Sequence, residues 1–497
     1  MGSIGPYSDA GGAFNPFKGY FNSIDGTLRP TKETRHGTNP ATLETLPEVP
    51  VATEKEVQAA VSAGQRAFKS WSQKPWSTRR DAVLSFADAI ETHAQGLAEL
   101  LTMEQGKPTS LATGEVSYTL NWMRGMAKIE FIDEMRTTKQ GSKVIIRYVP
   151  LGLTVGILPW NYPVAQLCQK MLQAVLTGNT IIIKPSPFTP YCGLKLGELA
   201  QRCFPPGVVQ VLSGDNLLGP MLTGHPDIKK ISFTGSTATG KHIMQNAAKT
   251  LKRVTLELGG NDPAIVCKDV DVGVVAPQVG LGTWGSSPWI ASLAFYNSGQ
   301  VCLAIKRVYV HASIYDSFKS VVVRHVNGLK VGNGREDGVA LGPVQNQMQY
   351  DKVSGFLSAA EKEGWTVVAG GVSTKQPGTG YFIQPAVIDR PPDDSSIVTE
   401  EPFGPIMPLL AWTDKDDVIS RANDTPMGLG ASVWSKNLDE ARSIAEKLEA
   451  GSVWLNAHLA LDVSVPFGGH KESGIGCEGG IEGLKAFCNI QSLYLSS

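Results

Sequence analysis

The 497-residue sequence lacks an excess of charge of either sign. Its formal net charge is -1, and charged residues make up 18% of the chain. Nucleic-acid-binding proteins usually carry a basic excess and solvating tails carry acidic runs, so we expect no nucleic-acid partner and no such tail. The length exceeds what one compact core normally serves, and 42% hydrophobic residues fit a globular chain of at least two domains.

The chain also lacks paired cysteines and a recognisable targeting signal. Its seven cysteines are odd in number, and no two have metal-ligand spacing, which argues against a disulfide framework and a metal site. Residues 1–6 show no basic-then-apolar pattern, and Pro6 breaks the myristoylation pattern. We therefore expect free thiols and a cytoplasmic protein without a bound metal.

One long stretch lacks charge altogether. Residues 272–305 contain no Asp, Glu, Lys or Arg, and their length would span a bilayer. The stretch also contains five glycines, two prolines, two glutamines and an asparagine, which would interrupt an apolar helix. We therefore expect a buried segment near an active site and no membrane span.

Strand and helix patterns alternate through most of the chain. Residues 153–158 and 180–183 are rich in β-branched side chains, whereas 164–176 and 190–203 have helical character. Gly178 follows the first helix, where a C-terminal glycine is common. Strand patterns in the second half cover 305–310, 366–369, 407–411, 430–434 and 452–455. Such alternation predicts two α/β domains with parallel sheets, facing each other across a cleft.

Three motifs follow one another and supply an amide, a carboxylate and a thiol. They are Pro159-Trp160-Asn161, then Leu256-Glu257-Leu258-Gly259-Gly260, then Asn297-Ser298-Gly299-Gln300-Val301-Cys302. A thiol can attack an aldehyde carbon, an amide can stabilise the resulting oxyanion, and a carboxylate can activate water. These are the side-chain groups needed to oxidise an aldehyde through a covalent thioester, once a hydride acceptor is present.

With these motifs, the sequence resembles the aldehyde dehydrogenase superfamily. The resemblance runs from Glu104-Gln105-Gly106-Lys107-Pro108 to Pro466-Phe467-Gly468-Gly469. It implies two doubly wound α/β domains and a small β oligomerisation flap, and hence a homodimer or homotetramer. The implied bounds are 1–127 with 151–258 for the cofactor-binding domain, 259–477 for the catalytic domain, and 128–150 with 478–497 for the flap. A strand pattern at 144–148, ended by Pro150, agrees with the flap.

The resemblance also implies the catalytic roles. Cys302 is the nucleophile, which forms a thiohemiacetal and, after hydride transfer to NAD(P)+, a thioester. The Asn161 amide and the Cys302 backbone N–H stabilise the oxyanion. Glu257 is the general base for the water that hydrolyses the thioester, and Lys170 assists in proton handling. A single buried cysteine is usually an inert hydrophobe, so the assignment depends on the three motifs together.

A nicotinamide cofactor follows from the same resemblance. The matching residues are Trp160, Lys184, Ser186, Gly235, Ser236, Leu258, Gly259, Glu401 and Phe403. Lys184 and Ser186 meet the adenosine ribose, and Ser236 meets the pyrophosphate near a helix N-terminus. Pro187 stands where many relatives carry a glutamate that grips the ribose and repels a 2′-phosphate. NAD is the expected cofactor, and NADP stays an alternative.

The resemblance places a substrate pocket beside the nucleophile. Its residues are Tyr162, Gln166, Gln169, Val301, Leu303, Leu461 and Phe467. Two glutamines lie among aliphatic and aromatic side chains, and this set contains no arginine or aspartate that could bind a charged group of the substrate. We therefore expect a neutral aldehyde as the small-molecule substrate and a carboxylic acid as the product.

The spacing from Glu257 to Cys302 exceeds the family's usual spacing by about three helical turns. The additional residues lie near 279–289, which contain two tryptophans, three glycines and a proline. Three interpretations are open: a loop that caps the substrate tunnel or meets a partner, a surface bulge without a role, and an error in the gene model. If the segment blocks the site, the chain would be a nucleotide-binding family member with impaired catalysis.

Overall fold

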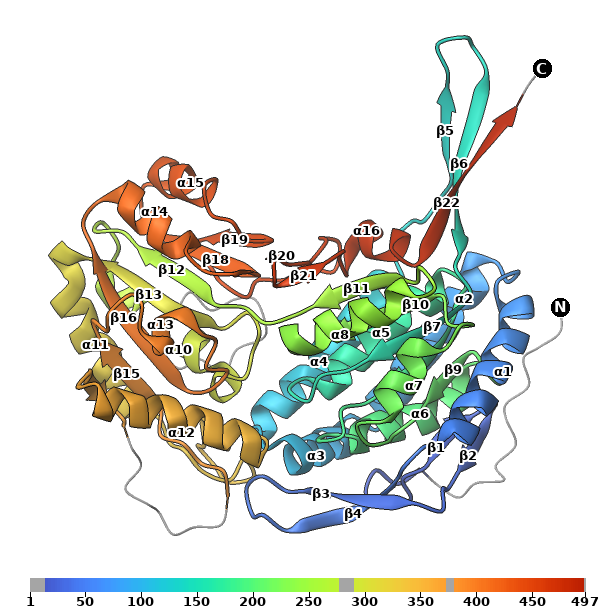
Figure 1. Ribbon diagram of the computed structural model, residues 1–497, viewed down its shortest axis with the longest axis horizontal. Coiled ribbons are helices and arrows are strands. Elements are labelled where there is room, and N and C mark those ends of the chain that lie inside the picture. Colours follow the sequence, from blue (N-terminus) through green and yellow to red (C-terminus); the bar gives the residue numbers. More distant parts are fainter. Residues whose placement is uncertain (1–13, 277–289, 372–379, 496–497) are drawn as a thin grey trace.

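The structure is a computed structural model that describes residues 14–276, 290–371 and 380–495. Two sheets covered by helices lie side by side, and a narrow three-stranded sheet projects from the body next to the first of them (Figure 1). The predicted fold class, two doubly wound α/β units with a small β flap, is confirmed. The predicted insertion at 279–289 lies outside the described residues.

The first sheet has eight strands, and its five central strands are parallel. Its order is β2 (Thr27–Arg29), β1 (Asn22–Ile24), β9 (Val209–Val211), β8 (Thr180–Lys184), β7 (Leu153–Ile157), β10 (Lys230–Thr234), β11 (Arg253–Glu257) and β21 (Gly474–Ile475). In β8, Ile181 and Ile183 pack into one hydrophobic cluster and Ile182 into another. A strand buried on both faces requires a continuous apolar sequence, which is the pattern that predicted it.

Helices cover both faces of this sheet. On one face lie α1 (Glu54–Trp71), α7 (Leu218–Gly224) and α8 (Thr237–Ala248). On the other lie α5 (Pro163–Leu176) and α6 (Tyr191–Cys203), backed by α2 (Trp76–Thr92), α3 (Ala94–Gln105) and α4 (Thr109–Met126). After α5, Gly178 has a φ of +89°, the left-handed conformation that closes a helix. The predicted helix end is therefore confirmed.

The second sheet has seven strands, all parallel except β14 at one edge. Its order is β14 (Thr366–Ala369), β15 (Ala386–Asp389), β16 (Ile406–Trp412), β13 (Ile305–His311), β12 (Asp262–Val266), β18 (Gly430–Trp434) and β19 (Ser452–Leu455). Around it lie α9 (Val272–Val275), α10 (Ile290–Phe295), η1 (Tyr296–Gly299), η2 (Ala312–Ile314), α11 (Tyr315–Asn327), α12 (Gln347–Lys362), α13 (Ser396–Thr399), α14 (Lys415–Asn423) and α15 (Leu438–Ala445). All five strand patterns predicted for this half are confirmed.

The projecting sheet joins two distant parts of the chain (Figure 1). It consists of β5 (Glu134–Thr137), β6 (Lys143–Pro150) and β22 (Cys488–Leu495), and α16 (Gly480–Lys485) precedes β22. β22 pairs with β6 from Cys488 opposite Pro150 to Leu495 opposite Lys143. Two small antiparallel two-stranded sheets are also present: β3 (Thr34–Thr38) with β4 (Thr45–Pro50), and β17 (Met427–Gly428) with β20 (His470–Lys471). The strand predicted at 144–148 lies within β6.

Three further properties bear on the site. Among the helices that the structure describes, none is both long and apolar enough to cross a membrane. All seven cysteines are free thiols. In the described parts of the chain, no group of three or more His, Cys, Asp or Glu side chains could hold a metal ion.

Candidate active site

Parallel strands of the first sheet bring the predicted residues to one edge. β7 leads to Asn161, β8 ends at Lys184, β10 leads to Ser236, and β11 ends at Glu257. The carboxyl ends of parallel strands are where α/β proteins bind ligands. A cavity of about 740 Å³ opens at this edge, and residues of the second half, including Cys302, close its other side. The cavity therefore lies where the sequence predicts the site, between the two halves.

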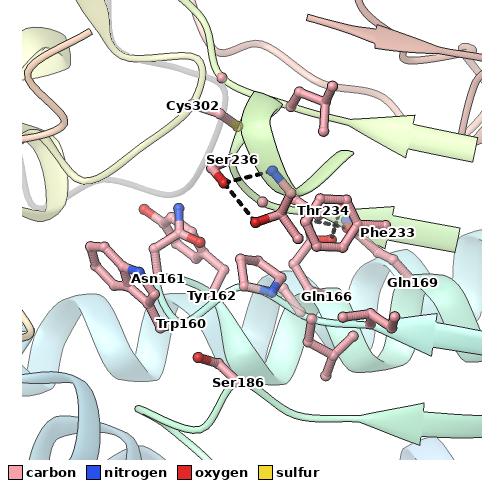
Figure 2. Close-up of a pocket in the computed structure, with 18 of the residues that line it drawn as sticks. Trp160, Asn161, Tyr162, Gln166, Gln169, Ser186, Phe233, Thr234, Ser236 and Cys302 are labelled. Atoms are coloured by element: carbon pink, nitrogen blue, oxygen red, sulfur yellow. Dashed lines mark hydrogen bonds between the residues drawn. The ribbon is translucent and has the colours of Figure 1, made fainter. Parts of the chain in front are cut away.

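The cavity brings most of the predicted site residues together. Its lining includes Trp160, Asn161, Tyr162, Gln166, Gln169, Lys184, Ser186, Gly235, Ser236, Leu258, Gly259, Val301, Cys302, Leu303, Glu401, Phe403, Leu461 and Phe467. Figure 2 shows Trp160, Asn161 and Tyr162 on one side and Cys302 on the other. Two predicted residues do not line the cavity: Glu257 and Lys170 are buried behind its wall.

Cys302 lies in a tightly constrained loop. Asn297 and Ser298 have φ of 50° and 57°, and Gly299 has a φ of +73°. A Cβ atom on Gly299 would lie 2.1 Å from the Gly404 carbonyl oxygen, so only glycine fits there. Burial raises the pKa of the Cys302 thiol to about 12, although a nearby lysine opposes this. The thiol is therefore protonated at neutral pH and needs a base to become a nucleophile.

A buried ion pair holds the loop that carries Asn161. Lys107 Nζ lies 2.5 Å from Glu115 Oε2, and both side chains are fully buried. Lys107 also donates to the Asn161 carbonyl oxygen at 2.9 Å. Glu115 Oε1 accepts from the backbone N–H groups of Val164 and Ala165 at the start of α5. The pair thus fixes the main chain at Asn161 itself and at the start of α5, which follows it.

The Asn161 side chain points toward the nucleophile loop. Its Nδ2 donates to the Gln300 carbonyl oxygen at 2.9 Å. A side-chain amide has two N–H hydrogens, so the second remains available to a ligand near Cys302. This geometry suits an oxyanion donor.

Glu257 is a buried carboxyl group with no hydrogen-bond partner among the described residues. Its side chain is 3% exposed, and both oxygens lack a partner there. Burial and the neighbouring Glu478 raise its pKa well above the usual range, whereas Lys170 lowers it. A buried carboxyl with a strongly shifted pKa beside a ligand cavity is typical of an acid–base group.

Lys170 is paired with a residue that the sequence did not indicate. Its Nζ lies 2.6 Å from Glu478 Oε1 and 3.1 Å from Ser232 Oγ, and Ser232 donates to the same carboxylate oxygen at 2.8 Å. Glu478 lines the cavity, so a chain of polar groups connects buried Lys170 with the cavity. Because 308 residues separate Lys170 from Glu478, no local pattern could reveal the pair.

The far end of the cavity offers two groups that attract an anion, Lys184 and the start of α8. Among the described residues, Lys184 Nζ has a single hydrogen bond, 3.5 Å long, to the Pro185 carbonyl oxygen. Burial, and then Arg35, lower the pKa of Lys184 to about 8. Ser236 is the N-cap of α8 and accepts from the Thr239 N–H. An ammonium group with one long hydrogen bond and a helix N-terminus both suit an anionic ligand.

The substrate end is apolar with a row of polar groups along α5. Gln166 Oε1 accepts from Thr234 Oγ1 at 3.1 Å, and Gln166 Nε2 donates to Gln169 Oε1 at 3.3 Å. The Tyr118 and Trp122 rings, 5.5 Å apart, add an aromatic wall that the sequence did not indicate. Figure 2 shows Gln166 and Gln169 reaching from one helix into the cavity.

Comparison with known proteins agrees with this geometry. The family model described as "Aldehyde dehydrogenase family" matches residues 28–493. The chain therefore belongs to the aldehyde dehydrogenase family, whose members are oxidoreductases with a nicotinamide cofactor.

Particular relatives cover almost the whole chain. A "Putative aldehyde dehydrogenase FUS7" of Gibberella fujikuroi is 41% identical over 479 residues, 96% of this chain and 99% of the relative. The structure of the NAD+ complex of aldehyde dehydrogenase from Bacillus cereus is similar, with 34% identity, a TM-score of 0.89 and 96% of each chain covered. An E. coli "NADP dependent enzyme" has 33% identity and a TM-score of 0.90, with 97% of this chain and 99% of that chain covered.

Proposed function

We propose that this protein oxidises a neutral aldehyde to a carboxylic acid, with Cys302 as the nucleophile. The observation that carries the proposal is the meeting of three groups at one end of the cavity. The Cys302 thiol and the Asn161 amide line the cavity, and the unpartnered carboxyl of Glu257 lies directly behind it. A nucleophile, an oxyanion donor and a base in one place are the groups that thioester chemistry requires.

The first half of the reaction forms a bond between Cys302 and the substrate. The thiol gives up its proton to solvent in the cavity, its sulfur bonds to the aldehyde carbon, and the carbonyl oxygen becomes an alkoxide. The second N–H of Asn161 and the Cys302 backbone N–H stabilise that oxygen. An oxidised nicotinamide held near Glu401 and Phe403 would supply the acceptor for the hydrogen that leaves the carbon with its electron pair. The carbon–oxygen double bond re-forms, and a thioester remains on Cys302.

The second half releases the acid. Glu257 takes a proton from water, and the water oxygen attacks the thioester carbon. The carbon–sulfur bond breaks, and a proton returns to the Cys302 sulfur. Lys170 favours the ionised form of Glu257 electrostatically, and Glu478 gives Lys170 a polar connection to the cavity.

The residues at the far end fit a dinucleotide. Lys184 and Ser186 suit the adenosine ribose, the start of α8 at Ser236 suits the pyrophosphate, and Glu401 suits the nicotinamide ribose. The remaining members of the set, Trp160, Gly235, Leu258, Gly259 and Phe403, line the same cavity. We favour NAD, and the absence of a carboxylate at Pro187 keeps NADP as the second candidate.

We further propose a homodimer or homotetramer formed through the flap at 128–150 and 478–497. The flap carries large apolar side chains with high exposure, including Ile132 at 70% and Ile490 at 69%. Several large apolar side chains exposed on one small sheet favour an interaction surface. The free thiols fit a reducing compartment such as the cytoplasm. We assign 1–127 with 151–258 to the cofactor-binding domain and 259–477 to the catalytic domain.

The test is the formation of NADH or NADPH, followed by absorbance, with a panel of neutral aldehydes. Cys302→Ala should abolish turnover, whereas Cys203→Ala, a half-buried thiol at the end of α6, should retain it. The ratio of the two wild-type rates identifies the preferred cofactor. Turnover that survives in Cys302→Ala would refute the thioester mechanism.

A further inference from the structure

The backbone carbonyls around Cys302 are held by side chains from separate elements. Lys306 Nζ donates to the carbonyl oxygens of Val301 at 3.0 Å, Cys302 at 2.8 Å and Ala304 at 3.4 Å. His458 Nε2 lies 2.7 Å from the Leu303 carbonyl oxygen. With the bond from Asn161 to the Gln300 carbonyl, five successive carbonyls, 300–304, have a side-chain partner.

One of these bonds sets the direction of a catalytic N–H. The Val301 carbonyl and the Cys302 N–H belong to the same peptide plane, and the described chain contains no cis peptide. In a trans peptide the C=O and N–H point in opposite directions. By fixing the Val301 oxygen, Lys306 therefore aims the Cys302 N–H away from itself.

Lys306 also connects this loop with the proposed cofactor site. Its side chain is 3% exposed, and its Nζ lies 3.2 Å from Glu401 Oε1. The same Glu401 oxygen accepts from the Gly260 N–H at 3.2 Å. A buried ammonium with three carbonyls and a carboxylate around it is well satisfied, so it can hold these segments in one fixed arrangement.

The acidic groups around Cys302 outnumber the basic ones. Glu401, Asp262 and Glu257 disfavour a thiolate there, whereas Lys306 favours it. Asp262 and His458, which both interact electrostatically with Lys306, are fully buried and 3.7 Å apart. The neighbouring Arg307 donates instead to the carbonyls of Asn261 and Ala422, so it does not replace Lys306.

We propose that Lys306 is a positioning residue for the Cys302 chemistry. It orients the Cys302 N–H through the Val301 carbonyl, and it supplies the positive charge that favours the thiolate. This inference rests on the proposed function only in taking Cys302 as the nucleophile.

The test is the pH dependence of Cys302 alkylation by iodoacetamide, measured on the Cys302 peptide by mass spectrometry. In Lys306→Met the profile should move to higher pH by about one unit, which is about tenfold slower alkylation at a fixed pH below the pKa. The conservative Lys306→Arg should restore most of the rate. In turnover assays, Lys306→Met should lower kcat far more than it changes KM, because the N–H acts on the oxyanion.

A matched control exists on α6. Lys195 is also buried, donates to two backbone carbonyls, of Lys18 and Gly19, and is paired with Glu198. Lys195→Met should leave the alkylation profile unchanged. A folded Lys306→Met with the wild-type profile would overturn the inference.

If Lys306→Met does not fold, Lys306→Gln decides the question, because it keeps a donor for the carbonyl oxygens and removes only the charge. The alkylation profile should again move to higher pH, and an unchanged or lowered profile would overturn the inference. The two proposals fail separately. A wild-type protein that oxidises no aldehyde, yet shows the Lys306 effect on alkylation, would refute only the proposed function.

Discussion

Replacing Lys107 by methionine tests the ion pair that holds the Asn161 loop. The substitution keeps the volume of the side chain but leaves the Glu115 carboxylate buried without its cation. Both side chains are fully buried, and removing one partner of such a pair costs about 3–5 kcal/mol. At about 2–4 °C per kcal/mol for a domain of this size, the Tm should fall by on the order of 10 °C.

The two remaining bonds of Glu115 make the prediction specific. Its second oxygen still accepts from the Val164 and Ala165 N–H groups, so α5 should form. The Asn161 carbonyl, however, loses its shorter hydrogen bond, from Lys107 at 2.9 Å, and keeps the longer one from Asn297 at 3.5 Å. We therefore expect kcat to fall more than KM changes, because the amide is displaced from the oxyanion.

Thermal unfolding followed by fluorescence, with a double-mutant cycle, checks the reasoning. Lys107→Met combined with Glu115→Gln removes both charges, so its cost should be smaller than the sum of the two single costs. The control is Arg442→Met in the exposed Arg442–Glu446 pair, which should change stability by less than about 1 kcal/mol. Additive single costs, or a Lys107→Met effect as small as that of the control, would refute the argument.

Two further predictions concern the chemical steps, and a third concerns cofactor binding. Asn161→Ala should lower kcat by about 10²–10³-fold with little change in KM, and a steady-state assay that finds kcat unchanged would exclude the amide as the oxyanion donor. Glu257→Gln should produce a burst of one reduced cofactor per active site, followed by slow turnover, because the thioester forms but is not hydrolysed. Rapid-mixing absorbance would detect the burst. Slow kinetics in a single phase would contradict the prediction. Lys184 loses its proton as the pH rises through about 8. Cofactor affinity should therefore weaken above pH 8, by at most roughly tenfold for each pH unit. Fluorescence titration should show this dependence in the wild type and no pH dependence in Lys184→Met.

Local patterns predicted the elements whose burial is continuous or whose ends carry a glycine. β8 and α5 are examples, since Ile181–Ile183 are buried on both faces and Gly178 closes the helix. β12 was not predicted, because Asp262 and Pro263 at its start are typical of turns. It is nevertheless a strand, since β13 and β18 supply parallel partners on both sides. Tertiary pairing therefore overrides local preference at this position.

The sequence predicted the reacting residues of the site, but not the residues that hold them in place. Cys302 and Asn161 stand in recognisable local patterns, and both line the cavity. Glu478 and Lys306 carry no such pattern, because their roles depend on partners brought together by folding. Lys306 meets Glu401, and Glu478 meets Lys170 across 308 residues. A sequence without its fold contains the reacting groups but not the contacts that hold them.

The pairing of β22 with β6 has a consequence for the synthesis of the chain. The ribosome releases Lys143–Pro150 long before it has made Cys488–Leu495, its partner at every position. Until then one edge of β6 is open, and unpaired strand edges invite association with other chains. Lys170 likewise has no ion-pair partner until Glu478 has been synthesised. A nascent chain that stops short of its last twenty residues would therefore have an unfinished flap and a lysine without its carboxylate partner, so premature termination should yield aggregation rather than a smaller working enzyme.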